Sequence, residues 1–162
     1  MPLTVVTDVA VKQAGNVKIL FGPKITNLAS PSLAAFTVDA TCPIREFNHD
    51  VEVSFTDDQS LCQLDATTQL DKRTQKLGPI RFRVNAANLE TLKALHAPTA
   101  DIGVFLRPFT PSATDAAVAD KGLAWNAKVA KYVLNPIAIG NEYEVTAEYY
   151  AVTHDDNAAL AA

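Results

Sequence analysis

The feature that most constrains the fold is a strict polar and apolar alternation near the C-terminal end of the chain. One side of the alternation holds Glu142, Glu144, Thr146 and Glu148, and the other holds Tyr143, Val145, Ala147 and Tyr149. Successive side chains of a β-strand point to opposite faces, so the pattern predicts a half-buried strand with an acidic row on its exposed face. The chain therefore has to build a sheet that buries the second row.

Other alternating segments extend this prediction to most of the chain. Strands are expected at 17–21, 51–56, 80–84, 102–109, 125–134 and 139–152, with an irregular or edge strand inside 36–47. One helix is expected at 85–96, where leucines recur with helical spacing before a proline. Many short strands with a single helix predict a mostly β fold, an antiparallel β-sandwich or open barrel flanked by one α-helix.

Length and composition predict one domain. The 162 residues are 48% hydrophobic and can bury a sizeable core. We expect a single β domain over residues 1–152 that begins with an N-terminal arm at 1–16, and a frayed C-terminal tail at 153–162, because the chain ends in an alanine-rich run. The polar stretch 57–76 has few apolar residues and is expected to project as a hairpin or loop.

The charge and the apolar pattern exclude some classes of protein. The net charge of −4 argues against a broad surface that binds phosphate backbones. No apolar run reaches the length of a membrane-spanning helix, and the N-terminus has no basic region followed by an apolar one. We expect a protein made in the cytoplasm, without a membrane partner.

Residues that could carry chemistry are few and scattered. Cys42 and Cys62 lack the spacing of a metal site, and we expect buried reduced thiols, with a disulfide as the alternative. His49, His96 and His154 do not complete a zinc site or a nucleophilic triad. The sequence therefore predicts no enzyme, no cofactor and no metal.

The order of these elements resembles that of a siphophage major tail tube protein. The resemblance runs over roughly residues 17–152. The segments that carry it are Lys24-Ile25-Thr26-Asn27-Leu28 before Ser30-Pro31-Ser32, Thr41 to Phe47, the long polar stretch before Leu77-Gly78-Pro79-Ile80-Arg81-Phe82, the single helix, and Asn126 to Val133 with Asn135-Pro136 before Glu142 to Val145.

The resemblance implies an assembly and a location. Tail tube subunits form six-membered rings that stack into a hollow tube, and sheets of neighbouring subunits join into a ring-closed inner barrel. DNA passes through this conduit without specific binding. The implied location is the virion, in the phage tail. The implied partners are further copies of the chain, a tape measure protein, a tail terminator and a distal tail protein.

Three groups of residues receive expected roles in such an assembly. The acidic row of Glu142, Glu144 and Glu148 is expected to line the lumen, where it would repel DNA, and an outer solvated face is the alternative. The arm is expected to reach another subunit through Leu3, Val5 and Val9. The polar stretch is expected to contact the next ring through Asp57, Asp58, Leu64, Asp71, Lys72 and Arg73.

Other readings of the sequence stay open. A tail terminator or a contractile-type inner tube subunit would share the same architecture. From a different class, a soluble carbohydrate- or peptide-binding β-sandwich would need an exposed aromatic cluster on one face.

Overall fold

A computed structural model of the chain describes residues 17–41, 43–58, 67–85, 88–96, 101–109, 111, 113–136 and 142–162. Its strands are β1 (Val17–Pro23), β2 (Val38–Asp39), β3 (Ile44–Glu46), β4 (His49–Asp58), β5 (Thr67–Arg83), β6 (Asp101–Pro108), β7 (Lys121–Leu134) and β8 (Glu144–Ala159). The same residues also contain a 3-10 turn, η1 (Leu33–Ala35), and one helix, α1 (Leu89–Leu95).

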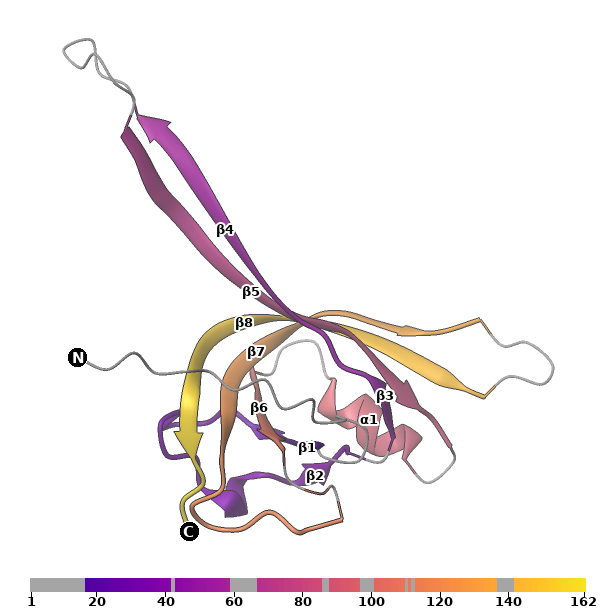
Figure 1. Cartoon of the computed structure of the whole chain (residues 1–162). Coiled ribbons are helices and arrows are strands. Elements are labelled where there is room, and N and C mark those ends of the chain that lie inside the picture. Colours follow the sequence, from indigo (N-terminus) through magenta and orange to yellow (C-terminus); the bar gives the residue numbers. More distant parts are fainter. Residues whose placement is uncertain are drawn as a thin grey trace.

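The strands form one antiparallel sheet that curls into a half-barrel. Their order is β2-β1-β6-β7-β8-β5-β3, and β4 also pairs with β5. Helix α1 lies against the concave side of the sheet (Figure 1). The prediction of a mostly β fold, an open antiparallel barrel flanked by one helix, is confirmed, and the sandwich alternative gives way to a single curled sheet.

The main core fills the concave side of the sheet. Phe21, Phe82, Trp125 and Tyr149 are each at most 1% exposed there, and Leu92 of α1 packs against the same cluster. The rings of Phe21 and Phe82 lie 6.0 Å apart between centroids. Burying a large apolar side chain contributes about 1.5–3 kcal/mol, so these residues hold the curl of the sheet.

The alternation near the C-terminus is confirmed for β8 itself. Val145, Ala147 and Tyr149 are at most 1% exposed. Tyr143, expected to share their inward face, is 54% exposed, because it precedes the first residue of β8. Its carbonyl oxygen accepts a hydrogen bond from the N–H of Val84 at 2.8 Å.

The prediction of a frayed tail at 153–162 is wrong. Strand β8 continues to Ala159, which pairs with Lys121 of β7. Beyond the strand, Leu160 is 2% exposed and packs in a second core cluster on the opposite side of the sheet, together with Phe105. The N–H of Ala161 donates to the carbonyl of Pro31 at 2.8 Å. Ala158 is fully buried in the same cluster, so the tail is held in place by packing and hydrogen bonds.

His96 attaches the end of α1 to the sheet. Its Nδ1 lies within hydrogen-bond distance of the Leu92 carbonyl, its Nε2 contacts the Tyr149 hydroxyl, and its ring stacks on Tyr132. A carbonyl only accepts, so Nδ1 carries the proton and Nε2 accepts from Tyr149. Burial lowers the pKa of His96, although the bond to the Leu92 carbonyl opposes this shift. Burial also raises the pKa of Tyr149, which keeps this hydroxyl protonated as a donor.

We expect this histidine to make the fold sensitive to acid. The folded state holds His96 neutral below its ordinary pKa of about 6.5, while the unfolded chain takes up the proton. The free energy of unfolding should therefore fall as pH drops from about 6.5 toward the lowered pKa of the folded state. Denaturant titrations at several pH values measure this slope. The double variant His96→Leu/Tyr149→Phe removes both polar partners and should show a smaller slope over that range, whereas an unchanged slope would contradict the assignment.

Candidate assembly surfaces

Besides the short end strand β2, two free strand edges lie at opposite sides of the strands β4, β5, β8 and β7 in the described part of the sheet. Within the described residues, β4 pairs only with β5. On the far side, β6 pairs with β7 only as far as Lys128, so Val129 to Leu134 pair only with β8 in the same part of the chain. Unpaired strand edges present backbone donors and acceptors and can pair with another strand.

One of these edges belongs to a hairpin that projects from the half-barrel. Strands β4 and β5 run outward together (Figure 1). A β-bulge between Leu77 and Ile80 interrupts the pairing of β5 with β8, which ends at Lys76. Gly78 sits in it with a φ of 126°, and a Cβ there would lie 2.9 Å from the carbonyl oxygen of Ala147. Only glycine suits both conditions, so Gly78 determines the position of this bulge.

The residues expected to contact a neighbouring ring lie either on this hairpin or outside the described residues. Asp57 and Asp58 belong to β4, and Asp71, Lys72 and Arg73 belong to β5. The expected projecting hairpin is therefore present. Leu64, the expected arm residues Leu3, Val5 and Val9, and both cysteines lie outside the described residues.

The two faces of the hairpin differ in polarity. Val51 and Val53 share one face and are 42% and 43% exposed. On the opposite face, Lys76 pairs with Glu52 at 3.0 Å. The alternation of β4 was predicted from the sequence as half-buried, but the valines extend past the core and remain in solvent. Exposed apolar side chains next to a free strand edge are typical of an interaction surface.

The acidic row meets basic side chains from other strands. Glu144 and Glu148 point away from the core on β8, and Glu142 precedes that strand. Glu142 contacts Arg83 of β5 and lies 3.2 Å from Arg45 of β3. The other close pairs are Lys131 with Glu148 at 3.5 Å and Arg81 with Glu46 at 3.1 Å.

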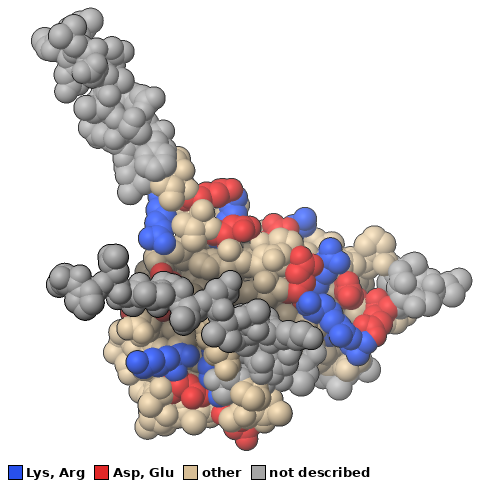
Figure 2. Space-filling model, in the orientation of Figure 1, with Lys and Arg blue, Asp and Glu red and all other residues tan. Residues whose placement is uncertain are grey.

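This outer face of β3, β5, β7 and β8 therefore carries both signs of charge. Figure 2 shows Lys and Arg side chains interleaved with Asp and Glu over this part of the molecule. Exposed ion pairs of this kind stabilise a fold by at most about 1 kcal/mol each. The face is therefore polar and mixed in charge rather than uniformly acidic.

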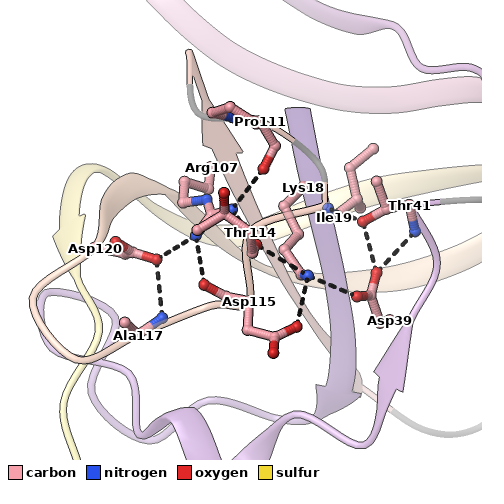
Figure 3. Close-up of polar contacts among 10 residues, drawn as sticks. All are labelled: Lys18, Ile19, Asp39, Thr41, Arg107, Pro111, Thr114, Asp115, Ala117 and Asp120. Atoms are coloured by element: carbon pink, nitrogen blue, oxygen red, sulfur yellow. Dashed lines mark hydrogen bonds and ion pairs between the residues drawn. The ribbon is translucent and has the colours of Figure 1, made fainter. Parts of the chain in front are cut away.

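Two cations are buried near the end of the sheet opposite the hairpin. Lys18 of β1 and Arg107 of β6 are 5% and 2% exposed. Arg107 donates to Asp120 at 2.5 Å and to three backbone carbonyls of the β6–β7 connection, those of Pro111, Thr114 and Asp115 (Figure 3).

Lys18 completes the same buried cluster from the neighbouring strand. Its Nζ lies 3.1 Å from Asp39, 3.7 Å from Asp115 and 3.2 Å from the Thr114 carbonyl. Burial alone would raise the pKa of Asp39, but hydrogen bonds from Thr41 and Lys18 outweigh it, and the pKa is lowered. The pKa of Asp120 is likewise lowered: burial opposes ionisation, and hydrogen bonds from Ala117 and Arg107 overcome it. The charges compensate one another, as buried charges must.

This cluster is structural and was not anticipated from the sequence. The signal that could have found it is a cation inside a strand whose two faces are both apolar. Lys18 stands between Val17 and Ile19 in β1, and Arg107 follows Leu106 in β6. Both strands contribute to the two core clusters, so a charge there has to be satisfied internally.

Neither a metal-binding cluster nor a membrane-spanning helix is found in the described part of the chain. Among the described residues, no three His, Cys, Asp or Glu side chains gather in a way that could hold a metal ion. Neither of the helical segments in that part of the chain is long and apolar enough to cross a membrane.

Comparisons with known proteins give little further information. No family model matches the chain, and no curated protein matches it in sequence. Among solved structures, it is similar to a chain in the cryo-EM structure of the anti-feeding prophage baseplate, determined with six-fold symmetry. The TM-score is 0.49 and the sequence identity 13%, over 93% of this chain and 96% of that chain.

Proposed function

We propose that this protein is a structural, non-enzymatic subunit that joins its sheet to those of identical neighbours in a closed ring, and that stacked rings form a phage tail tube. The observation that carries the proposal is the half-barrel with a free edge on β4 and a second on the far half of β7. A monomer would leave both edges open to aggregation, and a ring closes them. The resemblance to tail tube proteins suggests six subunits in each ring.

The direction of the strands supports this way of joining. Strands β4, β5, β8 and β7 are neighbours in that order, and each is antiparallel to the next. A second copy placed beside the first with the same orientation brings its β4 next to β7, and these two strands are again antiparallel. Each contact therefore uses two different surfaces and the ring can close, as heterologous contacts do in cyclic oligomers.

Such a ring would turn the outer face of these strands toward its centre, because the other side of the sheet is occupied by the core and α1. Glu144 and Glu148 would then line the lumen, with Lys131 among their neighbours. DNA would pass a polar surface without a continuous basic stripe to bind it. In the virion, the tape measure protein, a tail terminator and a distal tail protein are the proposed partners.

Electron microscopy of the purified chain tests the proposal directly. We expect rings or tubes with a central channel in negative stain, together with a concentration-dependent mass in solution. Rings that never stack would favour a tail terminator, and a strict monomer at high concentration would refute the assembly. A soluble binding sandwich would stay monomeric and bind a sugar or peptide.

Blocking the free edge of β4 should prevent assembly without unfolding the subunit. Adjacent residues of a strand direct their N–H groups to opposite edges. One of the two variants Glu52→Pro and Val53→Pro therefore loses only an N–H donor that points away from β5. That variant should keep the melting temperature of the parent chain and form no rings. The other proline variant, which loses a hydrogen bond within the hairpin, is its matched control. Normal rings from both variants would place the contact elsewhere.

A further inference from the structure

The ring proposed above joins two strand edges, and each edge exposes its backbone groups at fixed positions. On β4, the Gly78 N–H donates to the carbonyl of Asn48 at 2.7 Å, so the backbone groups of Asn48 point toward β5. Successive residues of a strand alternate in this direction. The N–H and the carbonyl of Val51, three residues further on, therefore point to the free edge.

The free half of β7 has the same arrangement. The Asn135 N–H donates to the carbonyl of Glu144 at 2.9 Å, so the backbone groups of Asn135 point toward β8. Those of Tyr132, three residues earlier, point to the free edge by the same alternation. Val51 of one copy and Tyr132 of another can therefore form a hydrogen-bonded pair of an antiparallel sheet.

The side chains of these two residues lie on the same side of the sheet. Val51 shares a face with Gln75, whose side chain accepts a hydrogen bond from Trp125 of the main core. Tyr132 packs against that core as well. Val51 is 42% exposed in the single chain, so an apolar partner from a neighbouring copy would remove it from water.

We propose that β4 of one copy pairs with β7 of the next copy in the register that sets Val51 across from Tyr132. The proposal rests on the ring described above and specifies which residues of the two edges meet in it. Because the strands are antiparallel, Glu52 then faces Lys131 on the outer face. A shift by one residue would set outer side chains against inner ones, so only shifts of two residues compete with this register.

Charge favours the proposed register. Glu52 lies 3.0 Å from Lys76 of β5 in its own chain, and Lys131 lies 3.5 Å from Glu148 of β8. Across the contact between copies, these four side chains would form a row in which the sign of the charge alternates. Opposite charges that face each other on neighbouring strands stabilise a sheet.

The two competing registers lose this match. A shift of two residues in one direction sets Glu52 across from the apolar Val133. The opposite shift carries Glu52 to Lys128, but β6 already pairs with that part of β7 through Asp101. Each shift therefore loses either the ion pair or part of the free edge.

The proposed register also determines the tilt of the strands in the ring. Within one copy, Asp50 lies in line with Tyr150 of β8. The neighbour's Asp50 would face Val133, which lies in line with Thr146 of β8. Equivalent positions are thus four residues apart along β8 (150 − 146), roughly 13 Å, over four strand spacings of about 4.8 Å. The resulting tilt of about 35° agrees with that of closed barrels, whereas the register shifted toward Lys128 gives only about 19°.

Disulfide cross-linking between copies tests the register. The natural cysteines Cys42 and Cys62 are first replaced by serine, and two new cysteines are then introduced on the outer face. In the proposed register, outer residues that face each other form the close, non-hydrogen-bonded type of pair, which suits a disulfide. Strands β5 and β8 separate the two positions within one copy, so a cross-link can only join different copies. We expect a ladder of covalent oligomers on non-reducing gels for Asp50→Cys/Val133→Cys and for Glu52→Cys/Lys131→Cys.

The matched controls use the same four positions in the other combination. Asp50→Cys/Lys131→Cys and Glu52→Cys/Val133→Cys correspond to shifts of two residues, and each single substitution also occurs in an in-register variant. These two variants should cross-link at least tenfold more slowly. Melting temperatures and negative-stain images of all four variants, taken before oxidation, check that the subunits fold and form rings.

The outcomes separate this register from the ring itself. Rings in which the shifted variants cross-link as fast as the in-register variants would overturn the register and keep the ring. Rings without any cross-link would overturn it as well, because the contact would then lie elsewhere. In-register cross-links in a chain that forms open polymers would keep the register and refute the ring. A chain that stays monomeric and forms no cross-link would refute both.

Discussion

Replacing Arg107 with methionine is expected to lower the free energy of unfolding by about 3–5 kcal/mol, the usual cost of removing one partner of a buried ion pair. The Arg107 side chain is 3% exposed, and its guanidinium bonds Asp120 and three backbone carbonyls of the β6–β7 connection. Methionine fills a similar volume but leaves those acceptors unpaired and Asp120 without its cation. In a domain of this size the melting temperature should fall by about 10 °C.

The matched control is Arg81→Met on the outer face. Arg81 also pairs with a carboxylate, Glu46, but its side chain is 51% exposed, so the change should cost less than about 1 kcal/mol. Arg107→Lys separates charge from geometry, because one ammonium cannot bond all four acceptors and should recover only part of the loss. Equal melting temperatures for Arg107→Met and Arg81→Met would show that the buried cluster contributes no net stability.

Replacing Asn126 with leucine is expected to destabilise the fold by about 2–5 kcal/mol and to loosen one segment first. The Asn126 side chain is buried, accepts a hydrogen bond from the Ile25 N–H at 2.7 Å and donates to the Ile25 carbonyl at 2.9 Å. It thus binds the segment after β1 as a neighbouring strand would. Leucine leaves the N–H and the carbonyl of Ile25 without hydrogen-bond partners. Trypsin should therefore cleave faster after the exposed Lys24.

Thr153→Val is the control for this second prediction. Asn126 also donates to Thr153 Oγ1 at 3.2 Å, and valine removes that acceptor while leaving both bonds to Ile25. We expect a cost of about 1 kcal/mol or less and unchanged cleavage at Lys24. Unchanged cleavage in Asn126→Leu itself would mean that the segment is held by its apolar contacts alone.

Local patterns predicted the parts of the fold that depend on near neighbours in the chain. The alternation of Val145, Ala147 and Tyr149 identified their buried face, because a strand imposes that period whatever it packs against. The helix at Leu89–Leu95, expected at 85–96, was readable for the same reason. The projecting hairpin was predicted because the polar stretch 57–76 has too few apolar residues to pack inward.

Contacts between distant residues could not be predicted in this way. Glu142 was read as part of a bare acidic row, yet its partners Arg45 and Arg83 come from strands much earlier in the sequence. Leu160 lies among alanines that give no periodic signal, and its burial depends on a cluster with Phe105. The lumen, arm and ring-contact roles remain predictions.

The order of strands in the sheet also determines when each strand can pair while the chain emerges from the ribosome. The register of β1 against β6 pairs Val17 with Pro108, residues that are 91 positions apart (108 − 17). Strand β1 must therefore wait until β6 has emerged, whereas β4 and β5 can pair as soon as their own turn is made. Contacts of such sequence separation slow folding and prolong the exposure of unpaired strands. We expect the hairpin to form early and the N-terminal side of the sheet to close late, so that growing chains carry β1 unpaired until β6 has emerged.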